Sequence, residues 1–214
     1  MRRAFFLALA LAACSGGEQV AEHVARGKAL LAEQKYEAAA AELSKATALD
    51  RNSAEAWLQL GHAYRGLKQY DTALAAYVAA KKIDRHSVAP HVAHAKVQLE
   101  LARVELATTE LNFVVEMDPK NLEALILLGQ VSQLPHKLPD GSFGVSRASL
   151  ERAELNLQAA TSLAPNNAEA NYELARVSQK LGKPEQAAAA RRQLESLAAT
   201  DAAAAYLLKL KESK

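Results

Sequence analysis

Cysteine, aromatic residues, glycine and proline are all scarce in this chain, and each shortage excludes a class of protein. The single cysteine cannot form an internal disulfide, and six histidines offer little material for a metal cage. Aromatic residues make up only 5% of the chain although hydrophobic residues make up 50%, with alanine dominant among them. Small residues that favour helices must therefore fill the core, and the composition predicts an all-α fold.

The chain also lacks a block of basic residues, and its formal charge is only +2. Both surplus positive charges belong to Arg2 and Arg3, ahead of a predicted cleavage site. Without them the 26 basic residues fall to 24, which equals the number of acidic residues. A neutral mature chain lacks the charge that nucleic-acid binding needs, so we expect no nucleic-acid partner.

Residues 1–13 have the pattern of a signal peptide. Two arginines are followed by an apolar run from Ala4 to Ala13. This run of roughly ten residues is too short for a bilayer core, which a helix of about 20 apolar residues crosses. The segment is therefore expected to be removed.

The residues Leu11-Ala12-Ala13-Cys14 resemble the bacterial lipobox. The resemblance implies that Cys14 is lipidated and attaches the mature chain to a membrane. The alternative is an ordinary secretory signal with an incidental cysteine. Because Ser15 stands where lipoproteins retained in the inner membrane carry aspartate, the resemblance favours the outer membrane, facing the periplasm. Residues 14–19 are interpreted as the lipidated cysteine and a short flexible tether.

One segment, residues 54–87, carries a spaced pattern of large and small residues: Trp57, Leu60, Gly61, Tyr64, Ala73, Tyr77 and Ala80. This pattern resembles the tetratricopeptide repeat (TPR), a helical hairpin of 34 residues. In that family the small residues allow two helices to approach closely, and the large ones fill the space around them. The seven residues are therefore predicted to form the core of the repeat.

Sliding by one period extends the array along most of the chain. Repeats are predicted at 20–53, 54–87, 88–121, 122–167 and 168–201, and the fourth contains an inserted loop at 134–145. Residues 202–214 are predicted to form a capping helix and tail. The resemblance therefore implies a right-handed α-solenoid of about five TPR hairpins with a C-terminal capping helix.

The resemblance also implies a concave surface that binds peptides, lined by the first helix of each hairpin. Two rows of residues are candidates for this groove because their spacing places them on one helical face. The first row is apolar and the second is mostly cationic: Val24, Leu58, Val92, Ile126 and Tyr172, then Lys28, His62, Lys96, Gln130 and Arg176. The alternative is that they are helix-edge residues without a binding role.

No motif for catalysis or for a cofactor is present, so we expect neither an enzyme nor a bound cofactor. The best metal candidate is the pair His91 and His94, with His86 upstream. Because the pair faces neighbouring helices and has no third ligand at an evident spacing, core histidines are the favoured interpretation and no metal is expected.

These features predict an adaptor of the bacterial cell envelope that binds other envelope proteins or peptides. The chain resembles the pilotin lipoproteins that help pilus secretins assemble, and export machinery is another plausible setting. The alternative is a periplasmic module for a small ligand or peptidoglycan fragment, for which the sequence offers no aromatic-lined pocket. The insertion is either a tolerated loop or, through Phe143, a docking element.

Overall fold

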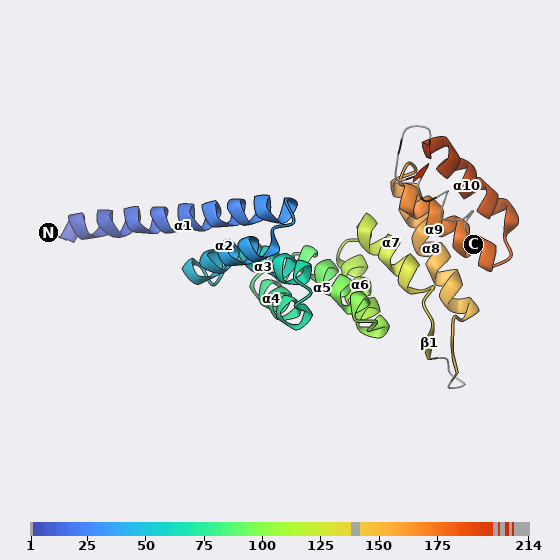
Figure 1. The fold of residues 1–214 in the computed structure, drawn as a ribbon, viewed down its shortest axis with the longest axis horizontal. Coiled ribbons are helices and arrows are strands. Elements are labelled where there is room, and N and C mark those ends of the chain that lie inside the picture. Colours follow the sequence, from blue (N-terminus) through green and yellow to red (C-terminus); the bar gives the residue numbers. More distant parts are fainter. Residues whose placement is uncertain (1, 138–141, 199–200, 202–203, 206, 208–214) are drawn as a thin grey trace. The chain divides into compact units, whose positions relative to one another are not determined.

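The fold is a succession of α-helical hairpins (Figure 1). The computed structural model describes the backbone of residues 2–137, 142–198, 201, 204, 205 and 207. Its helices are α1 (Arg2–Ala32), α2 (Tyr36–Leu49), α3 (Ala54–Gly66), α4 (Tyr70–Ile83), α5 (Ala89–Glu100), α6 (Val104–Met117), α7 (Leu122–Val131), α8 (Arg147–Leu163), α9 (Ala168–Lys180) and α10 (Pro184–Ala198). The predicted all-α fold class is confirmed.

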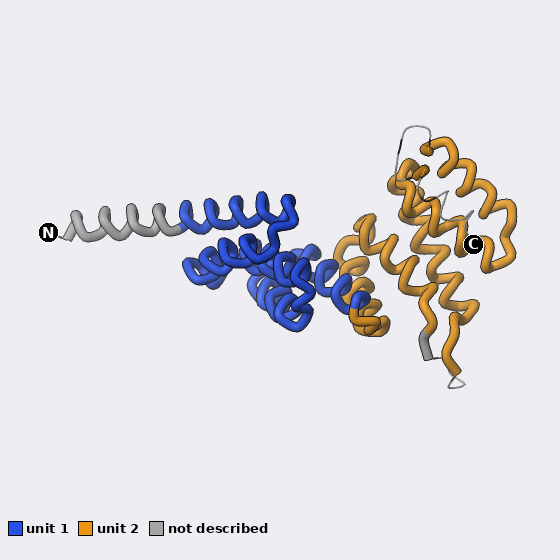
Figure 2. Tube along the Cα trace, in the orientation of Figure 1, with its two compact units in different colours: residues 1–100 blue, residues 101–214 orange. Residues whose placement is uncertain are grey.

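The chain divides into two compact units, residues 1–100 and 101–214 (Figure 2). Unit 1 contains the hairpins α1/α2 and α3/α4, and α5 packs against α3 and α4. Unit 2 contains the hairpins α7/α8 and α9/α10, and α6 packs against α7. The boundary at residue 100 lies inside the predicted repeat 88–121.

A missing side chain allows the two helices of a hairpin to approach closely. A Cβ atom on Gly61 would lie 2.3 Å from Cε1 of Tyr77, which is far inside van der Waals contact. Gly27 meets Leu43 in the same way at 2.4 Å. At Gly27 and Gly61 the absence of a Cβ atom therefore leaves the space that the large side chain opposite fills.

The turns that follow α1, α3, α5 and α9 each use a left-handed residue. Gln34, Lys68, Ala102 and Gly182 occupy equivalent places and have φ values of 57°, 58°, 56° and 72°. In the second repeat the amide of Gln69 donates to the carbonyl of Tyr64 at 2.9 Å, which closes the end of α3. Only the last repeat supplies a glycine, for which this conformation carries no steric cost.

The turns before α3 and α9 each end in a capping side chain. Ser53 Oγ accepts a hydrogen bond from the amide of Ala56, and Asn167 Oδ1 accepts one from the amide of Ala170. These caps satisfy backbone donors that the first turn of a helix leaves unpaired. The start of α3 and the start of α9 are therefore set by local sequence.

The predicted core residues of repeat 54–87 differ in their burial. Tyr77, Ala73 and Ala80 are completely buried, and Leu60 and Gly61 are also buried. The other two large residues, Trp57 and Tyr64, are only half-buried beside the core of unit 1. Trp57 uses its indole Nε1–H to donate to the carbonyl of Arg51 at 3.0 Å, which explains its place near the surface.

Two predicted irregular segments have regular structure. Helix α1 runs through the predicted tether at 14–19 without a break, because helix-favouring segments flank its two glycines on both sides. The predicted loop 134–145 contains an antiparallel pair of two-residue strands, β1 (His136–Lys137) and β2 (Phe143–Gly144). Residues 138–141 lie outside the described residues, and Phe143 is 78% exposed.

The chain termini are described in part. The side chain of Cys14 lies outside the described residues, as does most of the predicted cap at 202–214. Residues 204, 205 and 207 are helical, and Ala204 is buried in a cluster with Leu194 and Ala168. Among the described residues, no helix combines the length and apolar character needed to cross a membrane.

Candidate functional site

The apolar row that was expected to line a groove belongs mostly to the core. Four of its members are at most 9% exposed, and only Tyr172 is half-buried: Val24, Leu58, Val92 and Ile126. These four side chains lie on the side of the first helix that faces neighbouring helices, so packing buries their apolar surface. The prediction that they offer a binding surface is wrong for these four.

The second row lies nearer the surface, but its members already have partners. Lys28 Nζ lies 3.0 Å from a carboxylate oxygen of Glu55, and Gln130 Nε2 donates to Glu169 at 2.8 Å. In each case the ninth residue of one repeat contacts the second residue of the next. The charge of Lys28 is paired with Glu55, and Glu169 places a carboxylate beside the neutral Gln130, so the row is not the open cationic strip that was expected.

The remaining members of this row are also engaged. His62 Nδ1 lies 3.0 Å from the hydroxyl of Tyr77, and the two rings meet edge to face. Burial raises the pKa of Tyr77 above its usual value. Lys96 is half-buried and has an interaction of its own. This row therefore contributes to packing between repeats as well as to the surface.

Unit 1 contains an open pocket that neither row predicted. Its volume is about 580 Å³, and it lies between residues from α1 to α5. Its walls combine two tyrosines with polar and charged side chains: Tyr36, Gln59, His62, Arg65, Lys68, Tyr70 and Glu100. A pocket of this size and mixed lining suits one or a few side chains of a bound peptide.

Two contacts fix the walls of this pocket. The ring of Tyr36 lies over Gly66, where a Cβ atom would be 2.2 Å from the ring. Arg65 Nε donates to Glu100 at 2.7 Å, and a second guanidinium nitrogen contacts the same carboxylate oxygen. Lys68 is exposed and, among the described residues, has no ion-pair partner. The pocket therefore presents one unneutralised positive charge beside two aromatic rings.

The repeat pattern contains a signal for this pocket that the two predicted rows do not include. Tyr36 and Tyr70 occupy the same place in consecutive repeats, at the start of the second helix. Tyrosines at equivalent places in stacked repeats come to lie on one edge of the stack. The statement that the sequence offers no aromatic-lined pocket is therefore wrong.

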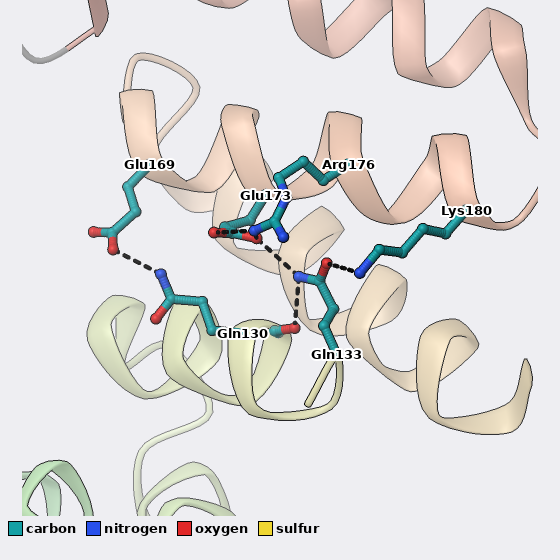
Figure 3. Close-up of polar contacts among 7 residues, drawn as sticks. Gln130, Gln133, Glu169, Glu173, Arg176 and Lys180 are labelled. Carbon is teal, nitrogen blue, oxygen red and sulfur yellow. Dashed lines mark hydrogen bonds and ion pairs between the residues drawn. The ribbon is translucent and has the colours of Figure 1, made fainter. Parts of the chain in front are cut away.

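Unit 2 carries a network of polar side chains between α7 and α9 (Figure 3). Gln133 donates to Glu173 at 2.8 Å and to the carbonyl of Gly129 at 3.2 Å. Arg176 donates to both oxygens of Glu173, at 3.1 Å and 2.9 Å. Lys180 donates to Gln133 at 3.3 Å. Gln133 and Glu173 are each only 7% exposed, so these bonds satisfy polar groups that are largely removed from water.

The histidines do not assemble a metal centre in the part of the chain that the structure describes, where no group of three potential ligands occurs. His91 and His94 are half-buried, and both have interactions.

The paired helices and the small residues between them match known repeat families. Residues 27–68 match a family model described as a TPR repeat, and residues 54–87 match the tetratricopeptide repeat. Residues 27–87 therefore consist of tetratricopeptide repeats. This fold is a scaffold for protein–protein interaction, and the predicted recognition of the family is confirmed.

Solved structures of other TPR proteins have the same fold. PilF of Pseudomonas aeruginosa is 19% identical with a TM-score of 0.74, over 92% of this chain and 86% of PilF. MamA of Desulfovibrio magneticus RS-1 is 21% identical with a TM-score of 0.67, over 84% and 94%. YrrB, a TPR protein with an unusual peptide-binding site, is 20% identical with a TM-score of 0.61, over 87% and 90%. A search of curated proteins finds no match.

Proposed function

We propose that this protein is a lipid-anchored adaptor of the bacterial cell envelope, which binds segments of other envelope proteins through the pocket of unit 1. The observation that carries the proposal is the pocket itself. It is open, has a volume of about 580 Å³, and places Lys68 near Tyr36 and Tyr70. Tyrosine supplies a large contact area with a polar edge, which is typical of protein-binding surfaces.

The fold supports binding of a peptide or protein. TPR proteins act as interaction scaffolds, and YrrB is a member with a peptide-binding site. Each hairpin of such an array contacts only its neighbours, so successive first helices form an extended surface. Lys68 favours a segment that carries an acidic residue beside an apolar one, because opposite charge speeds association and buried apolar area slows dissociation.

The proposed anchor depends on the amino-acid sequence. Leu11-Ala12-Ala13-Cys14 resembles the lipobox, and Ser15 favours the outer membrane, facing the periplasm. A diacylated cysteine has enough buried methylene groups for lasting attachment, whereas a single acyl chain binds only marginally. The likeness to PilF concerns the fold alone, so a role in assembling a pilus or an export complex stays part of the proposal.

A pull-down from a bacterial envelope extract tests the adaptor function. We expect Lys68→Glu and Tyr70→Ala each to reduce capture of the partner by about tenfold, because each removes one wall or charge of the pocket. Lys82→Ala is the matched control, since Lys82 is an exposed lysine of α4 outside the pocket. Circular dichroism checks that all variants keep their helix content.

The outcomes separate the proposal from its alternative. Capture that is equal in wild type, Lys68→Glu and Tyr70→Ala would contradict binding through this pocket. The pocket also lies within the size range of small-ligand sites, about 300–1,000 Å³. A small molecule that co-purifies with wild type and is lost in Tyr70→Ala, without any captured protein, would favour the small-ligand module instead.

A further inference from the structure

The insertion in unit 2 carries a large apolar side chain that its own chain does not cover. Phe143 is 78% exposed and lies on β2, just before Ser146, the residue that caps α8. The two strands extend beyond the ends of α7 and α8 (Figure 1). Within the described part of the chain, Phe143 has no ring contact. Burial of this ring by a partner would therefore be favourable.

The same unit contains a pocket between its second helices. Its volume is about 310 Å³, and α6 and α8 form its walls. Leu128 and Val131 of α7 form its base, and these residues are only 3% and 1% exposed. In another protein an apolar cavity of about 150 Å³ binds benzene, so this pocket has room for a phenyl ring and part of the backbone that carries it.

A small residue accounts for this pocket. The eleventh residue is Leu30 in the first repeat and Tyr64 in the second, and both side chains pack against the core of unit 1. In the repeat 122–167 the same place holds Ser132, which lines the pocket. Serine is much smaller than leucine or tyrosine, so it leaves space between α6 and α8. Unit 2 thus lacks a large side chain at a place where the first two repeats supply their own.

The wall of the pocket suits an aromatic ring. Arg152 of α8 lines it and is exposed, and no described carboxylate forms an ion pair with it. Arg147 on the same helix, by contrast, pairs with Glu151 at 3.0 Å. A guanidinium group over the face of an aromatic ring is attracted by the electrons of the ring. Arg152 can therefore cover a ring that rests on Leu128 and Val131.

We propose that two copies of this chain associate through these features: Phe143 of each copy enters the pocket beside Ser132 of the other copy. The ring and the pocket lie at the same end of the hairpin α7/α8, since Ser132 follows α7 and Phe143 precedes α8. One two-fold axis near this end can form both contacts at once, which closes the assembly as a dimer. The surface belongs to unit 2 and does not depend on the pocket of unit 1.

Sedimentation equilibrium of the full chain in a non-ionic detergent tests this association. We expect a monomer–dimer equilibrium for wild type. Phe143→Ser should weaken dimerisation by about tenfold or more, because each dimer loses two buried rings. Ser132→Tyr should weaken it to a similar degree, because the residue that the second repeat carries at this place fills the pocket. All variants share one N-terminal segment, so differences between them report on this surface.

Two control variants match these changes. Leu49→Ser removes a side chain that is 50% exposed from unit 1 and should leave dimerisation unchanged. Ser162→Tyr places a tyrosine at an exposed position of α8 outside the pocket and should also leave it unchanged. Thermal melts check the fold, and Ser132→Tyr should keep at least the melting temperature of wild type because the new side chain fills an existing space.

A mixture of Phe143→Ser chains and Ser132→Tyr chains gives the sharpest measurement. The first variant keeps the pocket and the second keeps the ring, so a mixed pair can form one of the two contacts. Neither variant can form any such contact with itself. We therefore expect the mixture to associate more strongly than either variant alone.

Three results would overturn the proposal: a monomeric wild type, a Ser132→Tyr variant that dimerises like wild type, or a mixture that associates no more strongly than its components. Because Phe143 and Ser132 both belong to unit 2, failure here leaves the result of the Lys68→Glu pull-down unaffected.

Discussion

At the scale of single residues, close approach between paired helices is set by one small residue and the large residue opposite it. Gly27, Gly61 and Gly129 each stand where a Cβ atom would overlap a buried side chain of the second helix. The opposing residue is Leu43, Tyr77 or Leu157, and all three are completely buried. The glycines therefore matter through the space they leave open, since each lies in an ordinary helix.

Gly61→Ala tests this relation. The new methyl group would overlap the Tyr77 ring, and overpacking in a core costs about 1–3 kcal/mol of unfolding free energy. Gly17→Ala is a control, because nothing lies within 4 Å of a Cβ atom there. Urea denaturation followed by circular dichroism measures both changes.

A second substitution shows whether the two residues are coupled. The repeat at 88–121 carries Ala95 and Leu111 in the places of Gly61 and Tyr77. We therefore expect Gly61→Ala to cost less in a Tyr77→Leu background than in wild type, so that the two changes are not additive. Additive costs would mean that the strain is relieved elsewhere.

At the scale of helices, polar contacts join neighbouring elements where apolar contact ends. Glu42 of α2 is the clearest case in unit 1. Its carboxylate lies 2.8 Å from His23 Nδ1 on α1 and 2.5 Å from Lys45 Nζ. The hydrogen bond from Lys45, followed by that from His23, lowers the pKa of Glu42 from 4.5 to about 2.

This shift predicts a dependence of stability on acidity. Because the folded pKa lies below the unfolded one, the stabilisation by Glu42 is complete above pH 4.5 and is lost as the pH falls toward 2. In Glu42→Gln the melting temperature should therefore fall less on acidification through this range than in wild type. Thermal melts at neutral pH and at about pH 3 measure the difference.

Glu37→Gln supplies the comparison for this prediction. Glu37 is an exposed residue of the same helix without a described ion pair. Its replacement should leave the acid dependence of the melting temperature as in wild type. If Glu42→Gln also behaves like wild type, the contact between α1 and α2 does not persist in solution.

At the scale of the whole molecule, the prediction concerns attachment to a membrane. Metabolic labelling with a fatty-acid analogue should mark the wild-type chain and leave Cys14→Ala unlabelled, because the thiol is the expected site of the thioether. The variant should also move from the membrane fraction to the soluble envelope fraction. Ser15→Ala keeps the cysteine and should be labelled like wild type. Label that persists in Cys14→Ala would rule out this anchor.

The sequence by itself determined the hairpins, their turns and the family. Helix boundaries depend on local signals such as Ser53 and Asn167, and the small and large residues of a hairpin recur at fixed spacing. These properties involve residues within one repeat, which is why periodicity reveals them. The short strand pair inside the insertion was missed, because two residues per strand give no period.

Only the tertiary structure decided which surface residues are available to a partner. The apolar row is mostly buried and members of the second row are paired because each first helix contacts the next repeat. Their partners therefore lie far away in the sequence, 27 residues for Lys28 and Glu55 and 39 for Gln130 and Glu169. Lys180 meets Gln133 across 47 residues, and Arg65 meets Glu100 across 35. Helical periodicity fixes which face a side chain occupies, whereas the stacking of repeats fixes what that face meets. The pocket around Tyr36 and Tyr70 depends on that stacking.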